Sequence, residues 1–171
     1  PKGRDIRPTS DKIRAAIFNA LQSRMDIEGA YVLDICSGTG ALGLESISRG
    51  AERCIFIDNS KTSLKLTQKN AAALGCEHRC DFLLKEAGRL GPRAETLPPA
   101  DLFFCDPPYN KNIIPAALEK LIEGSWLSGT VIGVLESEKS LAFSAPSFEI
   151  LNEKIYGDTK VIFVRLSSSV C

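Results

Sequence analysis

The chain has 171 residues, of which 44% are hydrophobic and 25% charged, and its formal net charge is zero. This composition is ordinary for a soluble globular protein with one core, and the zero net charge argues against a chain coated for nucleic-acid binding. No apolar run approaches the ~20 residues needed to cross a bilayer, and no signal-peptide pattern opens the chain. We therefore expect a single cytoplasmic domain over residues 1–171, with a basic N-terminal segment and helix (1–29) and a core (30–171).

The chain has six cysteines, three of which sit in strand-like apolar runs, at Cys36, Cys54 and Cys105. A reduced thiol in such a run behaves as a small hydrophobe, which indicates a reducing compartment and no disulfide framework. Cys76, His78 and Cys80 form a possible metal cluster. Because no second ligand pair follows at zinc-like spacing, we expect no metal site there.

The first 24 residues carry six basic and two acidic side chains, a local net charge of +4. After an irregular start, Thr9 is a suitable N-cap for an amphipathic helix. Its apolar positions recur at helical spacing, at Ile13, Ala16, Ile17, Ala20 and Leu21. A basic edge of this kind could meet phosphates or could be a solvated surface, and charge alone leaves both open.

Strand-like and helical patterns then alternate along the chain. Strands are predicted at 31–36, 54–58, 80–84, 101–105 and 130–135, helices at 41–49, 60–74 and 115–123, and a final antiparallel pair at 148–156 and 160–166. Residues 88–100 are expected to be a loop with a short helix. This alternation predicts an α/β, Rossmann-like fold with a doubly wound, mostly parallel seven-stranded sheet and a C-terminal antiparallel hairpin.

A glycine turn follows the first strand and opens the next helix. Gly38, Gly40 and Gly43 satisfy the Gly-x-Gly-x-x-Gly spacing that lets backbone N–H groups approach a ligand. Asp58 lies 20 residues after Gly38, at the end of the second strand. A carboxylate there can accept from both hydroxyls of a ribose, so this half of the chain is predicted to bind a nucleoside-bearing cofactor.

The tetrapeptide Asp106-Pro107-Pro108-Tyr109 follows the fourth strand directly. Two prolines remove two backbone donors and fix φ, so that the carbonyls are held rigidly. A carboxylate beside a fixed carbonyl offers acceptors for both hydrogens of an exocyclic amine, and Tyr109 offers a face for stacking on a base. The alternative is a proline-stiffened turn with a core tyrosine.

Together these stretches resemble S-adenosylmethionine-dependent methyltransferases that modify nucleobase amines. The closer resemblance is to the bacterial 16S ribosomal RNA guanine-N2 methyltransferase family, over nearly the whole chain, and it implies a class I methyltransferase fold. It rests on Arg7-Pro8-Thr9, Lys12-Ile13-Arg14, Ala16-Ile17-Phe18-Asn19, residues 33–45, Lys69-Asn70, Asp106-Pro107-Pro108-Tyr109 and Tyr156-Gly157-Asp158-Thr159.

The resemblance implies a role for each matching position. Asp34 and the loop from Gly38 to Gly40 would hold the methionine moiety, Asp58 the ribose, and Glu86 with Ala87 the adenine. The remaining assignments are Cys36, Ser37 and Asn59 to the cofactor site, Asp106, Pro107, Pro108 and Tyr109 to catalysis, and Arg7, Lys12 and Arg14 to RNA phosphates. Three departures stand out: Glu86 replaces the usual Asp, Ala15 replaces a common acid, and the family's basic N-terminal hairpin is mostly absent before Arg7.

The expected activity is methyl transfer from S-adenosylmethionine to guanine N2 of small-subunit ribosomal RNA, within a particle, by a monomer with no metal and no membrane partner. An adenine-N6 or DNA methyltransferase would use the same tetrapeptide, whereas a glutamine-modifying one typically begins it with Asn. A nicotinamide dehydrogenase would leave Asp106 to Tyr109 unexplained. A non-catalytic RNA- or partner-binding protein is the remaining alternative.

Overall fold

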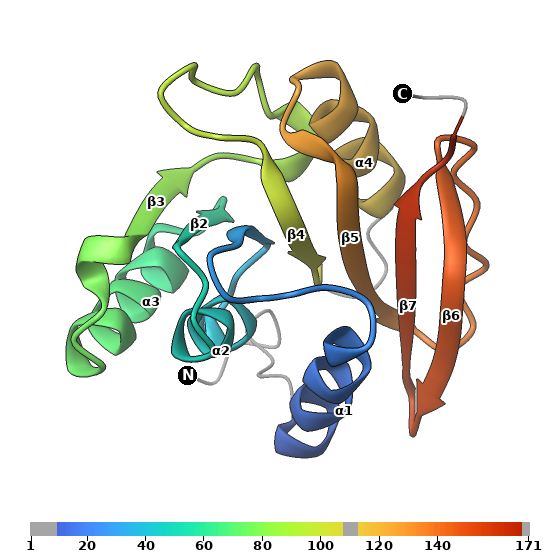
Figure 1. Ribbon diagram of the computed structural model, residues 1–171, viewed down its shortest axis with the longest axis horizontal. Helices are drawn as coiled ribbons and strands as arrows, with labels where there is room; N and C mark the ends of the chain where they lie inside the picture. The colour runs from blue at the N-terminus through green and yellow to red at the C-terminus, as the bar shows by residue number, and fades with distance from the viewer. Residues whose placement is uncertain (1–9, 108–112, 169–171) are drawn as a thin grey trace.

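The computed structural model describes residues 10–107 and 113–168 and is built on one seven-stranded sheet of order β3-β2-β1-β4-β5-β7-β6 (Figure 1). The strands are β1 (Tyr31–Ile35), β2 (Arg53–Asp58), β3 (Cys80–Leu84), β4 (Ala100–Cys105), β5 (Leu127–Glu138), β6 (Phe148–Tyr156) and β7 (Thr159–Leu166). The first five strands run parallel to one another, and β7 is antiparallel to both β5 and β6. The predicted sheet and its C-terminal hairpin are confirmed.

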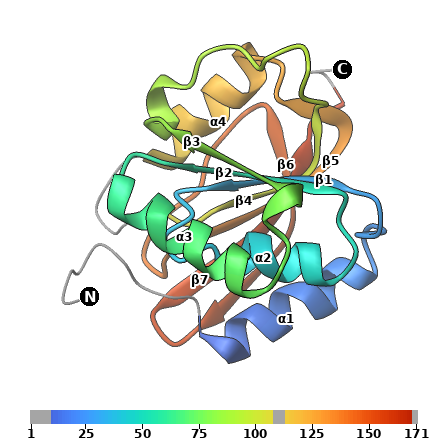
Figure 2. The same ribbon diagram turned by 90° about the vertical axis from the view of Figure 1, so that its left-hand side faces the viewer.

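Helices cover both faces of this sheet. Figure 2 shows α1 (Asp11–Gln22), α2 (Ala41–Ser48) and α3 (Lys61–Ala73) on one side and α4 (Ile113–Glu123) on the other. Two short 3₁₀ turns, η1 (Glu77–Arg79) and η2 (Ala87–Arg89), flank β3. None of the helices in the described ranges is long and apolar enough to cross a membrane.

Serine side chains cap the N-termini of two helices. Ser10 Oγ accepts from the Ile13 N–H at 3.2 Å, and Ser60 Oγ accepts from the Ser63 N–H at 3.1 Å. These bonds satisfy backbone donors that have no partner within the helix. The N-cap of α1 is thus Ser10, one residue after the expected Thr9, which lies outside the described residues.

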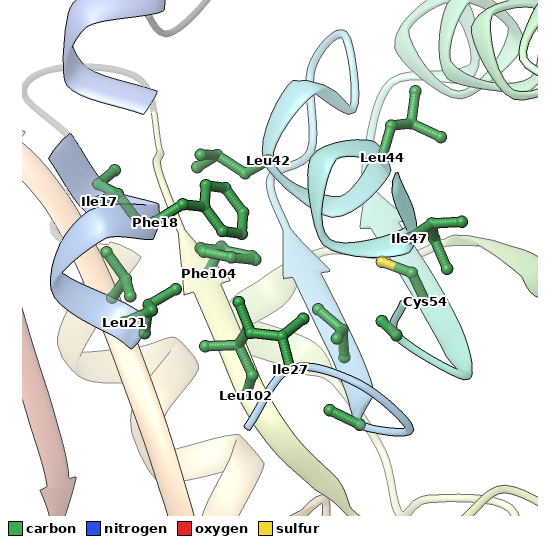
Figure 3. Packing of buried hydrophobic residues seen from close by; sticks show 14 of the residues in the cluster. Ile17, Phe18, Leu21, Ile27, Leu42, Leu44, Ile47, Cys54, Leu102 and Phe104 are labelled. Atoms are coloured by element: carbon green, nitrogen blue, oxygen red, sulfur yellow. The ribbon is translucent and has the colours of Figure 1, made fainter. Parts of the chain in front are cut away.

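Alternating side chains of the strands point to opposite faces of the sheet and contribute to two hydrophobic cores, one on each face. On the α1–α2 face, the Phe18 and Phe104 rings lie 5.8 Å apart and pack with Leu102 and Leu42 (Figure 3). On the α4 face, Phe103 contributes to the second core. Strand β4 lies in the middle of the sheet and is covered on both faces, so its side chains are apolar on both faces.

Strand β5 extends beyond its predicted end. The apolar pattern stops at Leu135, yet Glu136 and Ser137 are buried and pair with Val161 and Lys160 of β7. The backbone ladder to β7 therefore continues the strand through polar residues, which an apolar pattern does not reveal.

Candidate functional site

The predicted site residues converge on one edge of the sheet. Parallel strands place their carboxyl ends together, and β1 lies between β2 and β4, where the order of the sheet reverses. Ile35 pairs with both Ile57 and Cys105, and the Asp106 N–H donates to the Ile35 carbonyl at 3.4 Å. The turn after β1, the end of β2 and the start of the tetrapeptide are thus neighbours.

The turn after β1 is tightly wound through three residues with left-handed backbone. Cys36 has φ +59°, Gly38 +55° and Gly40 +79°. A Cβ on Gly40 would lie 2.5 Å from Thr67 Cγ2, whereas a Cβ on Gly38 would meet no atom within 4 Å. Glycine at position 40 therefore allows α3 to approach, while Gly38 borders open space.

Asp58 ties this turn to the end of β2. Its Oδ2 accepts from the Gly38 N–H at 3.0 Å, and its Oδ1 accepts from the Ser60 N–H at 2.9 Å. Each carboxylate oxygen can accept more than one hydrogen bond, so the side chain keeps capacity for ligand hydroxyls. Its contact with a ribose stays a prediction.

Asp34 lies beneath the turn and is only 3% exposed. Its Oδ2 accepts from the Gly43 N–H at 2.9 Å and so holds the first turn of α2 against β1. Burial raises the pKa of Asp34 well above its ordinary value, the Gly43 N–H opposes this, and the charges of Asp106 and Asp58 raise the pKa further. Its predicted contact with a methionine moiety stays a prediction.

Helix α3 supplies two side chains that fix the turn from outside. Thr67 Oγ1 donates to the Gly38 carbonyl at 3.0 Å, and Asn70 Nδ2 donates to the Thr39 carbonyl at 3.1 Å. Sequence reasoning assigned no role to either residue. The signal was present as a polar Thr67 on the apolar face of a helix and as the Lys69-Asn70 stretch of the family resemblance.

Ser37 adds a buried polar atom to the same turn. The residue is 9% exposed, and its Oγ has no hydrogen-bond partner among the described residues. Such an orphaned hydroxyl, with open space beside Gly38 and carboxylates at the strand ends, suits a ligand that carries cationic groups and hydroxyls. The residues present therefore fit S-adenosylmethionine, which has an ammonium, a sulfonium and a ribose diol.

The other predicted cofactor residues border the turn or follow β2 and β3. Cys36 is half-buried, and its thiol hydrogen-bonds that of Cys105; this bond and burial raise the pKa of Cys105. Asn59 is exposed beside Asp58. Glu86 is exposed and lies 3.4 Å from Arg89, while Ala87 is buried.

The start of the tetrapeptide lies at the end of β4. Asp106 is half-buried, and its charge acts on Asp34 across the β1–β4 pair. Pro107 is buried. Pro108 and Tyr109 lie outside the described residues.

The predicted RNA-binding residues differ in their surroundings. Lys12 is exposed on α1. Arg14 donates to Asp11 at 2.8 Å and lies 3.6 Å from Glu45, so two acids of the chain offset its charge. Arg7 lies outside the described residues.

Within residues 10–107 and 113–168, no group of three or more His, Cys, Asp or Glu side chains could hold a metal ion. Cys80 donates from its thiol to the Cys76 carbonyl at 3.4 Å. Burial and the neighbouring Cys76 raise the pKa of Cys80 to about 12, which keeps the thiol protonated.

Comparisons with known proteins agree with this fold. Ribosomal RNA small subunit methyltransferase D of Haemophilus influenzae is 29% identical over 154 residues, covering 89% of this chain and 79% of its own. A solved conserved hypothetical protein of Streptococcus pyogenes is 31% identical, with a TM-score of 0.75 over 89% of this chain and 94% of its own.

A solved ribosomal protein L11 methylase of Lactobacillus delbrueckii shares the fold alone, at 16% identity and a TM-score of 0.70, covering 93% of this chain and 81% of its own. The fold is that of the class I methyltransferases. The profile of the family described as conserved hypothetical protein 95 matches residues 1–165. The chain therefore belongs to the conserved hypothetical protein 95 family, that of the methyltransferases resembling ribosomal RNA small subunit methyltransferase D.

Proposed function

We propose that this protein transfers a methyl group from S-adenosylmethionine to the exocyclic N2 amine of a guanine in small-subunit ribosomal RNA. The observation that carries the proposal is the meeting of Asp106, Asp58 and the Gly38 turn at one edge of the sheet. Relatives named ribosomal RNA small subunit methyltransferase D, from Haemophilus influenzae and Escherichia coli, support the substrate class.

The cofactor would be held by the turn after β1 and by the carboxylates that follow it. Asp58 would accept from the ribose hydroxyls, Ser37 Oγ would gain its missing partner, and Glu86 with Ala87 would border the adenine. When bound, S-adenosylmethionine supplies a methyl group on a sulfonium, which is already an activated electrophile. Positioning and electrostatics, rather than a strong base, are then the protein's main contribution.

Asp106 and the Pro107 carbonyl would orient the target amine. Each would accept a hydrogen bond from one of the two N–H groups of guanine N2. These two bonds would turn the nitrogen lone pair toward the methyl group. As positive charge develops on the nitrogen, the Asp106 carboxylate stabilises it and then accepts the proton that the nitrogen releases. An amine inside a duplex cannot reach this site, so the guanine must be unpaired or flipped out.

The deciding experiment measures transfer of labelled methyl from S-adenosylmethionine to unmethylated small-subunit particles, with naked ribosomal RNA and DNA alongside. We expect label in particle RNA, mapped to guanine N2. Label mapped to adenine N6, to DNA or to protein would overturn the substrate. No label in any of them, with cofactor bound, would overturn the enzymatic proposal.

Asp106→Ala separates binding from chemistry. Since Asp106 holds the amine rather than the cofactor in this proposal, calorimetry should show cofactor affinity within about threefold of wild type. Methyl transfer should fall on the order of 100-fold or more, because a positioning contact and a stabilising charge are both removed. Full activity of Asp106→Ala would exclude this role.

A further inference from the structure

Helix α3 carries a row of exposed lysines that the proposed site does not use. Lys61, Lys65 and Lys69 recur every four residues and are all exposed. Four residues advance a helix by about 6 Å and turn it only about 40° past a full turn, so the three ammonium groups follow one strip. We call these three residues the α3 lysine row.

The opposite side of α3 fixes the direction of this row. Leu64 and Ala71 are buried against the sheet, and Thr67 and Asn70 hold the glycine turn. The lysines therefore project away from the turn. Lys61 opens the helix only three residues after Asp58, so the row begins beside the candidate cofactor site.

No acidic side chain in the described part of the chain forms an ion pair with the row. Helix α3 itself contains no Asp or Glu. Two acids on other elements are already used, Asp81 by Arg53 and Glu45 by Arg49. The row is thus an unneutralised strip in a chain whose net charge is zero.

Several cations elsewhere on the surface are paired with acids. Lys120 on α4 lies 2.9 Å from Glu123, and Arg165 at the end of β7 lies 3.0 Å from Glu149. Figure 1 shows α3 at the opposite end of the sheet from the β6–β7 hairpin. The α3 lysine row therefore lies at the β2–β3 end of the molecule.

We propose that the α3 lysine row binds the phosphate backbone of the substrate RNA. This inference rests on the proposed function and deepens it, because it assigns a second, sequence-independent contact beside the site. Lysine ammonium groups on flexible stems suit phosphates, and a strip without an aromatic side chain can position a strand but does not read its bases. RNA held along α3 would be anchored while a guanine enters at Asp106.

The test compares four proteins in binding to an in-vitro transcript of bacterial small-subunit ribosomal RNA over a series of salt concentrations. These are wild type, K65Q/K69Q, the charge-retaining K65R/K69R, and the control K120Q/R165Q, which removes the same charge from paired positions. Losing two phosphate contacts should flatten the slope of log affinity against log salt by about 1.4 to 1.8. We expect at least about tenfold weaker binding at low salt for K65Q/K69Q only.

Cofactor affinity, measured by calorimetry, should stay unchanged in all four proteins because the row faces away from the turn. Unchanged RNA affinity and salt slope in K65Q/K69Q would overturn the inference, as would an equal loss in K120Q/R165Q. If wild type methylates RNA while K65Q/K69Q binds it normally, only the lysine row is refuted. A wild-type protein that neither binds nor methylates RNA refutes the proposed function as well.

Discussion

Asp34 is a carboxylate whose burial makes its ionisation costly, and this has a consequence for stability. Because burial raises its folded-state pKa, the folded protein keeps a proton that the unfolded chain releases above about pH 3.8. The free energy of unfolding should therefore fall as pH rises from that value through the folded-state pKa. Asp34→Asn cannot ionise and keeps an acceptor for the Gly43 N–H, so its urea unfolding curves should depend less on pH across this window.

Asp34→Ala is the matched control, since it removes the charge and the acceptor together. It leaves the buried Gly43 N–H without its partner, which should lower the free energy of unfolding by about 1–3 kcal/mol relative to Asp34→Asn. If the two variants are equally stable at neutral pH, the hydrogen bond to α2 contributes nothing. If Asp34→Asn keeps the wild-type pH dependence, another group causes it.

Gly40 and Gly38 test two different costs of adding a side chain. Both have positive φ, so alanine at either should cost about 1–2 kcal/mol of backbone strain. At Gly40 the new Cβ would also press on Thr67 Cγ2, which adds about 1–3 kcal/mol of overpacking. Urea unfolding without cofactor should give a clearly lower free energy of unfolding for Gly40→Ala than for Gly38→Ala. Equal losses would show that α3 moves to make room for the new Cβ.

At the scale of an element, α3 holds the turn after β1 in place through two side-chain hydrogen bonds. Thr67→Val keeps the shape but removes the donor to the Gly38 carbonyl, and Asn70→Ala removes the donor to the Thr39 carbonyl. A hydrogen bond contributes about 0.5–1.5 kcal/mol, so each variant should bind S-adenosylmethionine roughly 3- to 10-fold more weakly. Gln68→Ala, on the exposed side of the same helix, should bind like wild type in calorimetry.

The elements that sequence could predict are those fixed by local pattern. Strands β1 to β4 were predicted within one or two residues because each is a short apolar run bounded by turn residues. The register of β2 and β4 on either side of β1 then brings Asp58 and Asp106 to the glycine turn. The apolar pattern of each single strand was enough to place the residue that follows it, because parallel strands have their carboxyl ends at a common edge of the sheet.

The features that sequence missed depend on contacts between distant segments. Strand β5 continues through Glu136 because β7 pairs with it, and Arg14 is offset by Glu45 of another helix. Thr67 and Asn70 reach the turn from about 30 positions away. None of these partners follows from the periodicity of the segment that contains the residue, because tertiary pairing decides them.

Across the whole molecule, three carboxylates gather at one edge of the sheet, and three lysines without an ion pair to a described residue follow the outside of α3. Asp34, Asp58 and Asp106 lie at the ends of three adjacent strands, and their mutual repulsion contributes to the raised pKa of Asp34. A cationic ligand would relieve this repulsion. The two charge distributions thus suit two different partners, a sulfonium cofactor inside and a phosphate backbone outside.

Because the proposed cofactor contacts come from the ends of β1 to β4, binding should stabilise the entire fold. S-adenosylmethionine at 100 times its Kd would add about 2.7 kcal/mol, which raises Tm by roughly 5–11 °C for a chain of this size. Asp58→Ala removes the bonds to Gly38 and Ser60 and the predicted ribose contact, so its cofactor-induced rise in Tm should largely disappear. Glu123→Gln, an exposed acid on α4, should keep the wild-type rise. Thermal unfolding with and without cofactor decides the matter: no rise in wild type would refute the cofactor, and a full rise in Asp58→Ala would refute the role of Asp58.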